Sequence, residues 1–375
     1  MANKTERYQR HALIDWFPQQ AVHDANIAVI GCGAVGNEVA KNLALLGVGH
    51  IDLYDFDTIE IHNLTKSVLF RESDVGKKKV DVARKRLIEL EPSVNVNAYH
   101  GDVWDLLNFK LLESYSCVLC CVDNFEARIK LNRLCLLSAT PLINTGIDSK
   151  YCQIESYPFG SNSEAACYEC SLPLTVYEKI QERYSCGWLK KVAFEEKKIP
   201  TTILTSSITG SLATSIAMGF IKGDFSNESS RILQNSITGQ SSLSTLAKSE
   251  RCPCCSEIYD KPQIISCRRD MISLNIDTEA ADFDALVTSS EPIIVSAECS
   301  LCGNKNESVE FTRAFDSDSS LTWCSDCKTE SVLVDIKDYF TLKELRDNYT
   351  NKSFPGKFVQ LQIHGKTVII ELRDN

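Results

Sequence analysis

Positive charge is scarce in this sequence of 375 residues. Lys and Arg number 40 against 50 Asp and Glu, which gives a formal net charge of −10 and a pI near 5.3. Because non-specific binding to a nucleic-acid backbone or to an anionic membrane needs a basic surface, we expect neither as a partner. The first twenty residues also lack an apolar stretch of signal-peptide length. These absences predict a soluble, cytoplasmic protein.

Long hydrophobic runs are equally rare. The longest uncharged run, residues 199–221, contains nine Ser or Thr residues and is interrupted by Gly210 and Gly219. We interpret it as a buried helix packed on small residues rather than a membrane span. Apolar residues make up 43% and charged residues 24% of the chain, enough for a globular protein of two domains.

Cysteine, in contrast, is abundant, with 17 residues of this type. In a secreted protein they would indicate disulfides. Without a secretory signal, and with several tight C-x-x-C pairs, metal binding is the better interpretation.

A glycine-rich loop near the start of the chain predicts a nucleotide-binding fold. The apolar run Ile27–Ile30 is typical of a buried parallel strand and leads directly into Gly31, Gly33 and Gly36, spaced as G-x-G-x-x-G. The following residues, 37–46, have helical periodicity. Such a turn brings the N–H groups of a helix against a phosphate. By itself, the pattern fits NAD-dependent enzymes equally well.

Residues further along favour ATP. A second strand, His50–Tyr54, ends at Asp55, and a third apolar run, Ser116–Val122, ends at Asp123. Ligand groups of an open α/β sheet lie at the carboxyl ends of its strands. Lys79 adds a cation for a triphosphate, and a carboxylate suits Mg²⁺, which binds carboxylate and phosphate oxygens. We therefore expect ATP and Mg²⁺ as the cofactors of this half.

The order of these motifs resembles the ThiF/MoeB/HesA superfamily, which includes the relatives of the ubiquitin-activating enzymes. The motifs are R-Y-x-R, G-x-G-x-x-G, D-F-D-x-I-x-x-x-N-L, G-K-x-K and V-D-N, and the resemblance covers roughly residues 5–258. It implies a Rossmann-like, mostly parallel α/β sheet with helices on both faces. The implied activity is ATP-dependent adenylation of the C-terminal carboxylate of a ubiquitin-like protein, with release of pyrophosphate.

The resemblance also implies roles for single residues. Asp55 would hold the ATP ribose, Asn63 and Lys79 the phosphates, and Asp123 the Mg²⁺ ion, with Asp57 and the three glycines lining the nucleotide. Lys66 stands where the family usually has arginine, so it keeps the charge and loses the planar two-pronged grip on phosphate. Arg10 matches an arginine that reaches the ATP site of the opposite subunit. With one copy of the motifs, the resemblance implies a homodimer.

Two sets of cysteine pairs predict two structural Zn²⁺ ions. The first set is separated by 81 residues and suits a staple between distant segments; the second, separated by 21, is typical of a compact zinc ribbon. Closed Cys₄ sites leave no position for substrate, so neither zinc should be catalytic. Cys254 is an alternative to Cys255, although only Cys255 has the C-x-x-C spacing. The predicted ligands are Cys167, Cys170, Cys252 and Cys255, and then Cys299, Cys302, Cys324 and Cys327.

Cys186 stands apart from these pairs. It precedes the long apolar helix, where activating enzymes that form a thioester carry their nucleophile on a mobile connection. A thiol that attacks the acyl-adenylate splits one difficult transfer into two easier ones. The alternative is an incidental cysteine. The full reading is adenylation, thioester formation on Cys186 and transfer to a ubiquitin-conjugating-type carrier enzyme, in a bacterial pathway such as an antiviral defence operon.

The chain is expected to divide into an adenylation domain, residues 1–261, with a mobile crossover at about 171–199, and an accessory domain, residues 262–375. The accessory domain holds the zinc ribbon, a β-prone run at Ser308–Phe311 and a terminal hairpin. Two alternatives to the full reading stay open. One is adenylation alone, feeding sulfur transfer or small-molecule modification; the other is an inactive scaffold subunit.

Overall fold

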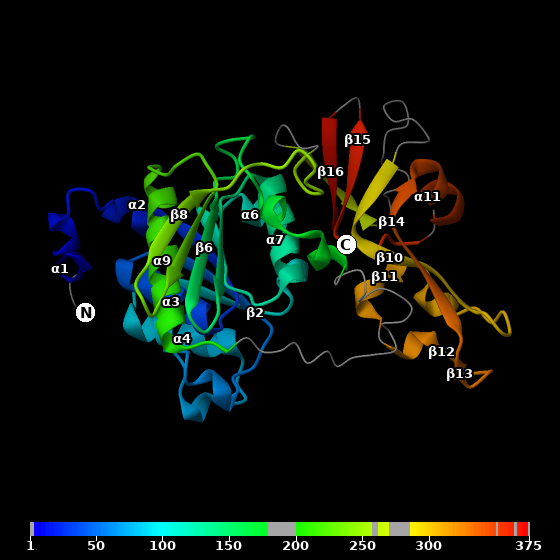
Figure 1. Ribbon diagram of the computed structural model, residues 1–375, viewed down its shortest axis with the longest axis horizontal. Helices are drawn as coiled ribbons and strands as arrows, with labels where there is room; N and C mark the ends of the chain where they lie inside the picture. The colour runs from blue at the N-terminus through cyan, green and yellow to red at the C-terminus, as the bar shows by residue number, and fades with distance from the viewer. Residues whose placement is uncertain are drawn as a thin grey trace. The chain divides into compact units, whose positions relative to one another are not determined.

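The computed structural model describes residues 4–178, 200–256, 262–269, 286–317, 319–349, 352–363 and 366–373. The chain divides into two compact units. The first comprises Met1–Leu172 with Ile199–Lys261, and the second Pro173–Lys198 with Pro262–Asn375. Each unit is built around its own β-sheet (Figure 1).

The first unit is built on an eight-stranded sheet in the order β3-β2-β1-β4-β5-β6-β7-β8. The first five strands in this order run parallel, and the last three are antiparallel additions. The chain reverses its direction of winding between β1 and β4, where ligands bind in doubly wound folds. The strands are β1 Asn26–Ile30, β2 His50–Asp55, β3 Asn95–His100, β4 Cys117–Cys120, β5 Leu142–Ile147, β6 Tyr151–Tyr157, β7 Ser230–Asn235 and β8 Ser241–Thr245.

Helices cover both faces of this sheet. α3, α4 and α9 pack together with the strands on one face, and α5 and α6 pack beside α7 on the other. Their bounds are α3 Ala34–Leu46, α4 Lys79–Leu90, α5 Val103–Leu106, α6 Phe109–Leu112, α7 Phe125–Ser138 and α9 Ile203–Lys222, with α1 Lys4–Arg7 and α2 Gln19–Asp24 before them. The fold predicted from the sequence, a mostly parallel α/β sheet with helices on both faces, is confirmed.

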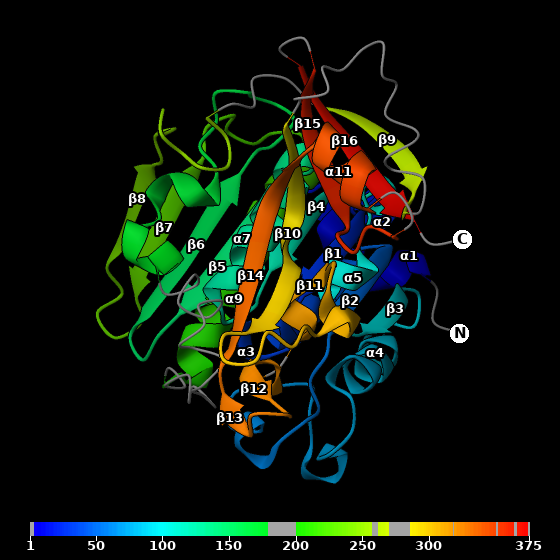
Figure 2. The same ribbon diagram turned by 90° about the vertical axis from the view of Figure 1, so that its right-hand side faces the viewer.

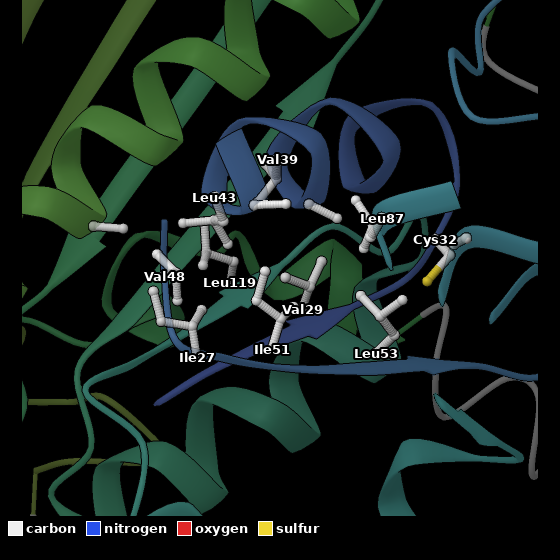
Figure 3. Close-up of a cluster of buried hydrophobic side chains, with 14 of the residues drawn as sticks. Ile27, Val29, Cys32, Val39, Leu43, Val48, Ile51, Leu53, Leu87 and Leu119 are labelled. Atoms are coloured by element: carbon white, nitrogen blue, oxygen red, sulfur yellow. The ribbon is translucent and has the colours of Figure 1, made fainter. Parts of the chain in front are cut away.

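The main core lies between the parallel strands and α3. Val29, Ile51 and Leu119 come from three neighbouring strands and meet Val39 and Leu43 of α3 (Figure 3). All five are fully buried. Burying an aliphatic side chain contributes about 1.5–3 kcal/mol, so this cluster fixes α3, and with it the glycine loop at its start, against the sheet.

The apolar run that opens near residue 200 forms α9. Its length and mean hydropathy of 1.3 would suffice for a membrane crossing, but it packs against α3, β5 and β6. Its buried face consists mainly of small residues, and a Cβ on Gly210 would lie 2.5 Å from the Cβ of Glu38. Close backbone approach explains the glycine, and the prediction of a buried helix is confirmed.

The second unit has a six-stranded sheet in the order β11-β10-β15-β16-β9, with β14 also paired to β10. Figure 2 shows β10 and β14 side by side along most of their length. A two-stranded β12–β13 hairpin carries one cysteine pair. The bounds are β9 Gln263–Arg268, β10 Leu286–Cys299, β11 Thr312–Arg313, β12 Trp323–Cys324, β13 Thr329–Glu330, β14 Val332–Thr341, α11 Leu342–Tyr349, β15 Phe358–Ile363 and β16 Lys366–Arg373.

One strand expected in this unit is absent at its predicted position. Ser308–Phe311 was predicted to be β-prone, but Glu307–Val309 is a 3₁₀ helix and only Thr312–Arg313 pairs with β10. Phe311 has φ 61°, which an extended strand cannot contain. The terminal hairpin is confirmed as the pairing of β15 with β16; its turn residues 364–365 lie outside the described residues.

Candidate functional site

The glycine loop joins β1 to α3 and leaves the first turn of that helix open. Gly31 has φ +91°, and a Cβ on Gly36 would lie 1.8 Å from the carbonyl oxygen of Gly31. Both positions therefore require glycine. Gly33 is the N-cap of α3; no side chain caps the helix, and nothing lies within 4 Å of a Cβ built there. A helix N-terminus with no capping side chain and with free space in front of it is a suitable site for a phosphate.

Asp55 ends the neighbouring strand β2 and turns its carboxylate toward this loop. One oxygen accepts the backbone N–H of Cys32 at 2.6 Å, and the other accepts that of Asp57 at 2.7 Å. Burial raises the pKa of Asp55, while the nearby charge of Lys79 and the two N–H donors oppose that rise. The carboxylate is thus held rigidly beside the glycine loop.

Lys79 opens α4 and brings the cation to the same place. Its side chain is only 9% exposed, and its ammonium donates to Asp57 at 2.5 Å. Burial acts to lower the pKa of Lys79, but the charge of Asp55 and the hydrogen bond to Asp57 outweigh it, so the pKa is raised. The lysine is a fixed cation that faces two carboxylates.

Asp123 follows β4 on the other side of β1. A Cβ on Gly31 would lie 2.8 Å from the carbonyl oxygen of Cys121, so the glycine loop packs directly on the chain that leads to Asp123. The Asp123 side chain is exposed and makes no hydrogen bond or ion pair within the described part of the chain. An exposed carboxylate at a strand end, beside an anion site, fits the oxygen donors that Mg²⁺ prefers.

Asn124 and Arg128 shape the turn from β4 into α7. The Asn124 side chain caps the helix by accepting the N–H of Ala127 at 2.8 Å. One turn later, the Arg128 guanidinium donates to the carbonyl oxygens of Val122 and Thr145 and to the side chain of Asn144. The sequence analysis missed Arg128. Its position on α7 gave no signal, because its oxygen partners Asn144 and Thr145 are brought to it only by the folding of β5.

Three other candidates lie away from these contacts. Asn63 accepts the N–H of Glu60 at 2.9 Å within a short 3₁₀ helix, Ile61–Asn63, and so has a local capping role. Lys66 donates to Thr201 at 3.1 Å, at the entrance to α9. Arg10 is exposed on the N-terminal segment. The structure thus groups Asp55, Asp57, Lys79 and the glycines, with Asp123 beside them.

The first cysteine tetrad has the geometry of a metal site. Cys167 Sγ lies 3.6 Å from Cys252 Sγ, and Cys170 Sγ lies 3.4 Å from Cys255 Sγ. All four sulfurs lie within 4.8 Å of one another. A tetrahedral zinc with Zn–S bonds of about 2.3 Å places its sulfurs about 3.8 Å apart, so the tetrad fits zinc.

Cys254, the alternative ligand, has a different environment. It is buried, and Asn132 of α7 donates to its sulfur at 3.5 Å. The same Asn132 donates to Glu169 at 3.2 Å and accepts the N–H of Tyr168 at 2.9 Å. Cys254 therefore packs beneath the tetrad, and the geometry favours Cys255 as the ligand.

The second tetrad lies in the second unit. Cys299 Sγ is 3.9 Å from Cys327 Sγ, and Cys302 Sγ is 3.7 Å from Cys324 Sγ, again with all four sulfurs within 4.8 Å. These spacings also fit one tetrahedral zinc. Cys186, predicted as the nucleophile, lies outside the described residues.

Comparison with known proteins finds a modifier-activating enzyme and an adenylyltransferase among the relatives of this chain. The chain is 31% identical over 195 residues to ubiquitin-like modifier-activating enzyme 5 of Bombyx mori, covering 49% of this chain and 48% of that one. It is 32% identical over 167 residues to molybdopterin-synthase adenylyltransferase of Salmonella typhimurium, covering 44% and 66%. The chain thus spans about half to two thirds of the length of these relatives.

One solved structure and one family model match a larger share of this chain than these two relatives do. The structure of E. coli MccB with AMPCPP and MccA superposes with a TM-score of 0.54 at 25% identity, covering 68% of this chain and 75% of that one. Residues 8–256, which include every residue of the nucleotide site and the first tetrad, match the ThiF family. The chain belongs to the ThiF family.

Proposed function

We propose that this protein adenylates the C-terminal carboxylate of a small ubiquitin-like or sulfur-carrier protein with ATP. One observation carries the proposal. The open N-terminus of α3 follows β1, Asp55 and Asp123 lie at or just after the ends of the strands on either side of β1, and Lys79 of α4 binds Asp57 beside them. This grouping occurs in a chain of the ThiF family. The relatives named as adenylyltransferase and as modifier-activating enzyme support this reaction class.

The chain's own groups suit that reaction. The substrate carboxylate attacks the α-phosphorus of ATP; a new P–O bond forms, the bond to the bridging oxygen breaks, and pyrophosphate leaves. Negative charge grows on the phosphates in this step. The N–H groups of α3 and the Lys79 ammonium supply positive groups for this charge. Lys79 exchanges Asp57 for a phosphate oxygen, while Asp55, held by two N–H donors, is placed for the ribose hydroxyls.

The remaining nucleotide contacts belong to the same proposal. Asp123 would hold Mg²⁺, which when bound neutralises charge on the departing phosphates. Asn63 and Lys66 would approach the phosphates when nucleotide enters. Arg10 would act in the site of a second copy, which makes the working form a homodimer. The two cysteine tetrads would each hold one structural Zn²⁺.

The second half of the proposal concerns Cys186. Its thiolate would attack the carbonyl carbon of the acyl-adenylate, forming a thioester and releasing AMP. A cysteine of a carrier enzyme would then take the acyl group. This step would place the protein in a cytoplasmic ubiquitin-like conjugation pathway, with antiviral defence as one setting.

A second candidate function stops at adenylation. MccB, whose structure superposes on this one, was solved with MccA, so the carboxyl end of an MccA-like chain is a further candidate acceptor of the adenylyl group. In that case the product would pass to sulfur or small-molecule chemistry and Cys186 would have no role. An inactive scaffold is the third reading; the grouping of Asp55 with Lys79 argues against it.

The test is ATP–pyrophosphate exchange with purified candidate proteins that end in glycine. Exchange that depends on one such protein and disappears in Asp123→Asn supports adenylation. ATP binding without exchange for any candidate would favour the scaffold. A reductant-sensitive adduct that persists at full yield in Cys186→Ala would remove the thioester step while leaving adenylation intact.

A further inference from the structure

We propose that Arg128 is a positioning residue that fixes the backbone before Asp123, so that this carboxylate meets Mg²⁺ in the orientation that nucleotide binding needs. The inference rests on the proposed function. It concerns the described turn between β4 and α7, where Arg128 lies one helical turn after the cap residue Asn124.

Arg128 ties three separate points of the chain together. Its guanidinium donates to the carbonyl oxygen of Val122, the residue immediately before Asp123. It also donates to the carbonyl oxygen of Thr145, at 2.5 Å, and to the side-chain oxygen of Asn144, both on β5. The hydrogen bonds of this one side chain therefore hold the turn that carries Asp123 against β5.

The partner on β5 is itself held in one orientation. The Asn144 amide nitrogen donates to Glu155 at 2.7 Å, which leaves its oxygen for Arg128. Glu155 is fully buried on β6 and pairs with Arg231 of β7 at 2.7 Å. A buried polar network whose members are all satisfied is rigid, because each alternative orientation would leave a buried group unpaired.

The guanidinium shape is essential to this arrangement. Within the described ranges no carboxylate lies within ion-pair distance of Arg128, so its oxygen partners are neutral. A planar fork reaches several oxygens at fixed angles, whereas a lysine ammonium is a point charge on a flexible stem. Arg128→Lys thus keeps the positive charge on α7 and removes the fixed set of hydrogen bonds, which separates positioning from simple electrostatics.

The experiment measures binding of AMPCPP by calorimetry, once with Mg²⁺ and once with EDTA, so no protein substrate is needed. The quantity of interest is the ratio of the two affinities. We expect Asp123→Asn to abolish the Mg²⁺ advantage and Arg128→Lys to reduce it about three- to tenfold, with little change in EDTA. The double variant should match Asp123→Asn, because Arg128 acts through that carboxylate.

Lys130→Ala is the matched control, since it removes a cation of the same helix that pairs with Glu126 and lies over the Trp104 ring. It should keep the wild-type ratio. Should Arg128→Lys fail to fold, as judged by melting temperature, Asn144→Ala removes one of the three contacts and should lower the ratio in the same direction.

Two results would overturn the inference: a wild-type ratio in Arg128→Lys or Asn144→Ala, or equal losses with and without Mg²⁺. Wild-type protein that binds no AMPCPP under either condition would instead refute the proposed function. Failure of the inference and failure of the proposed function therefore give different experimental results.

Discussion

The ammonium of Lys79 lies 2.5 Å from a carboxylate oxygen of Asp57, and the side chain of Asp55, two residues before Asp57, faces the glycine loop. The two carboxylates thus have different partners: Asp57 neutralises the lysine, and Asp55 is bound to backbone N–H groups. A phosphate that enters must compete with Asp57 for the lysine. The Asp57–Lys79 ion pair fixes the position of the ammonium. Breaking this pair subtracts from the free energy of phosphate binding.

Lys79→Met should lower the rate of ATP–pyrophosphate exchange by about 10²-fold, because it removes one preorganised donor to the charge that develops on the phosphates. Lys78→Met is the matched control: Lys78 is the exposed neighbour and N-cap of α4. Exchange measured with saturating protein substrate checks both. Equal losses of exchange rate in the two variants would show that the rate depends on overall charge and not on the position of Lys79.

The glycine loop offers a contrast between two single-methyl changes. Gly36→Ala should destabilise the fold by about 3 kcal/mol or fail to fold, because its Cβ would lie 1.8 Å from the Gly31 carbonyl oxygen. Gly33→Ala meets no atom within 4 Å and should melt near the wild type, yet weaken ATP binding. Thermal melting and nucleotide titration check the pair. If Gly33→Ala bound ATP with wild-type affinity, the phosphates would not lie at the N-terminus of α3.

Glu91 anchors the N-terminal segment. It is 2% exposed, accepts the Tyr8 hydroxyl at 2.9 Å and pairs with Arg7. Burial acts to raise the pKa of Glu91, but hydrogen bonds from Ser93 and Tyr8 and the charge of Arg7 outweigh it, so the pKa lies below its usual 4.5. Glu91→Gln should cost about 1–2 kcal/mol of folding free energy at pH 7.

The sign of the pH dependence follows from that lowered pKa. The contribution of Glu91 is fully present above pH 4.5 and is lost as the pH falls through the folded-state pKa. The stability difference between wild type and Glu91→Gln should therefore shrink in acid. Denaturant titrations at several pH values measure it. A difference that grows in acid would mean that the carboxylate is protonated in the folded protein.

Metal analysis tests the two tetrads independently. Wild-type protein should contain two zinc ions per chain, and Cys255→Ser and Cys302→Ser should each contain one. Cys254→Ser should retain two, because Cys254 packs against Asn132 outside the tetrad. Elemental analysis of the purified proteins gives these numbers. Loss of one zinc in Cys254→Ser, with two retained in Cys255→Ser, would exchange the roles of the neighbouring cysteines.

Much of the fold was predictable because the local sequence patterns favour the same strands and helices that the tertiary fold contains. The apolar run Ile27–Ile30 and the glycine spacing predicted β1, the loop and α3, and the structure has all three. Gly239, at φ +73°, lies in the turn between the antiparallel strands β7 and β8, a conformation that favours glycine. Parallel pairing of β1 with β2 and β4 then brings the chain ends of these strands to one edge.

The rest depends on contacts that sequence patterns do not encode. Arg128 looks like any other polar residue of a helix, because its oxygen partners lie on β5. Phe311 has a residue type that favours strands, but it adopts φ 61° and packs in the core of the second unit. In both places tertiary packing determines the outcome, and local propensity does not.

The first tetrad joins two parts of the first unit that are far apart in the sequence. Eighty-one residues separate Cys170 from Cys252, yet the four sulfurs lie within 4.8 Å of one another. Closing so long a loop removes conformational entropy from the unfolded chain. An ion held by this tetrad would therefore stabilise the first unit through its unfolded state, without any contact to the nucleotide groups.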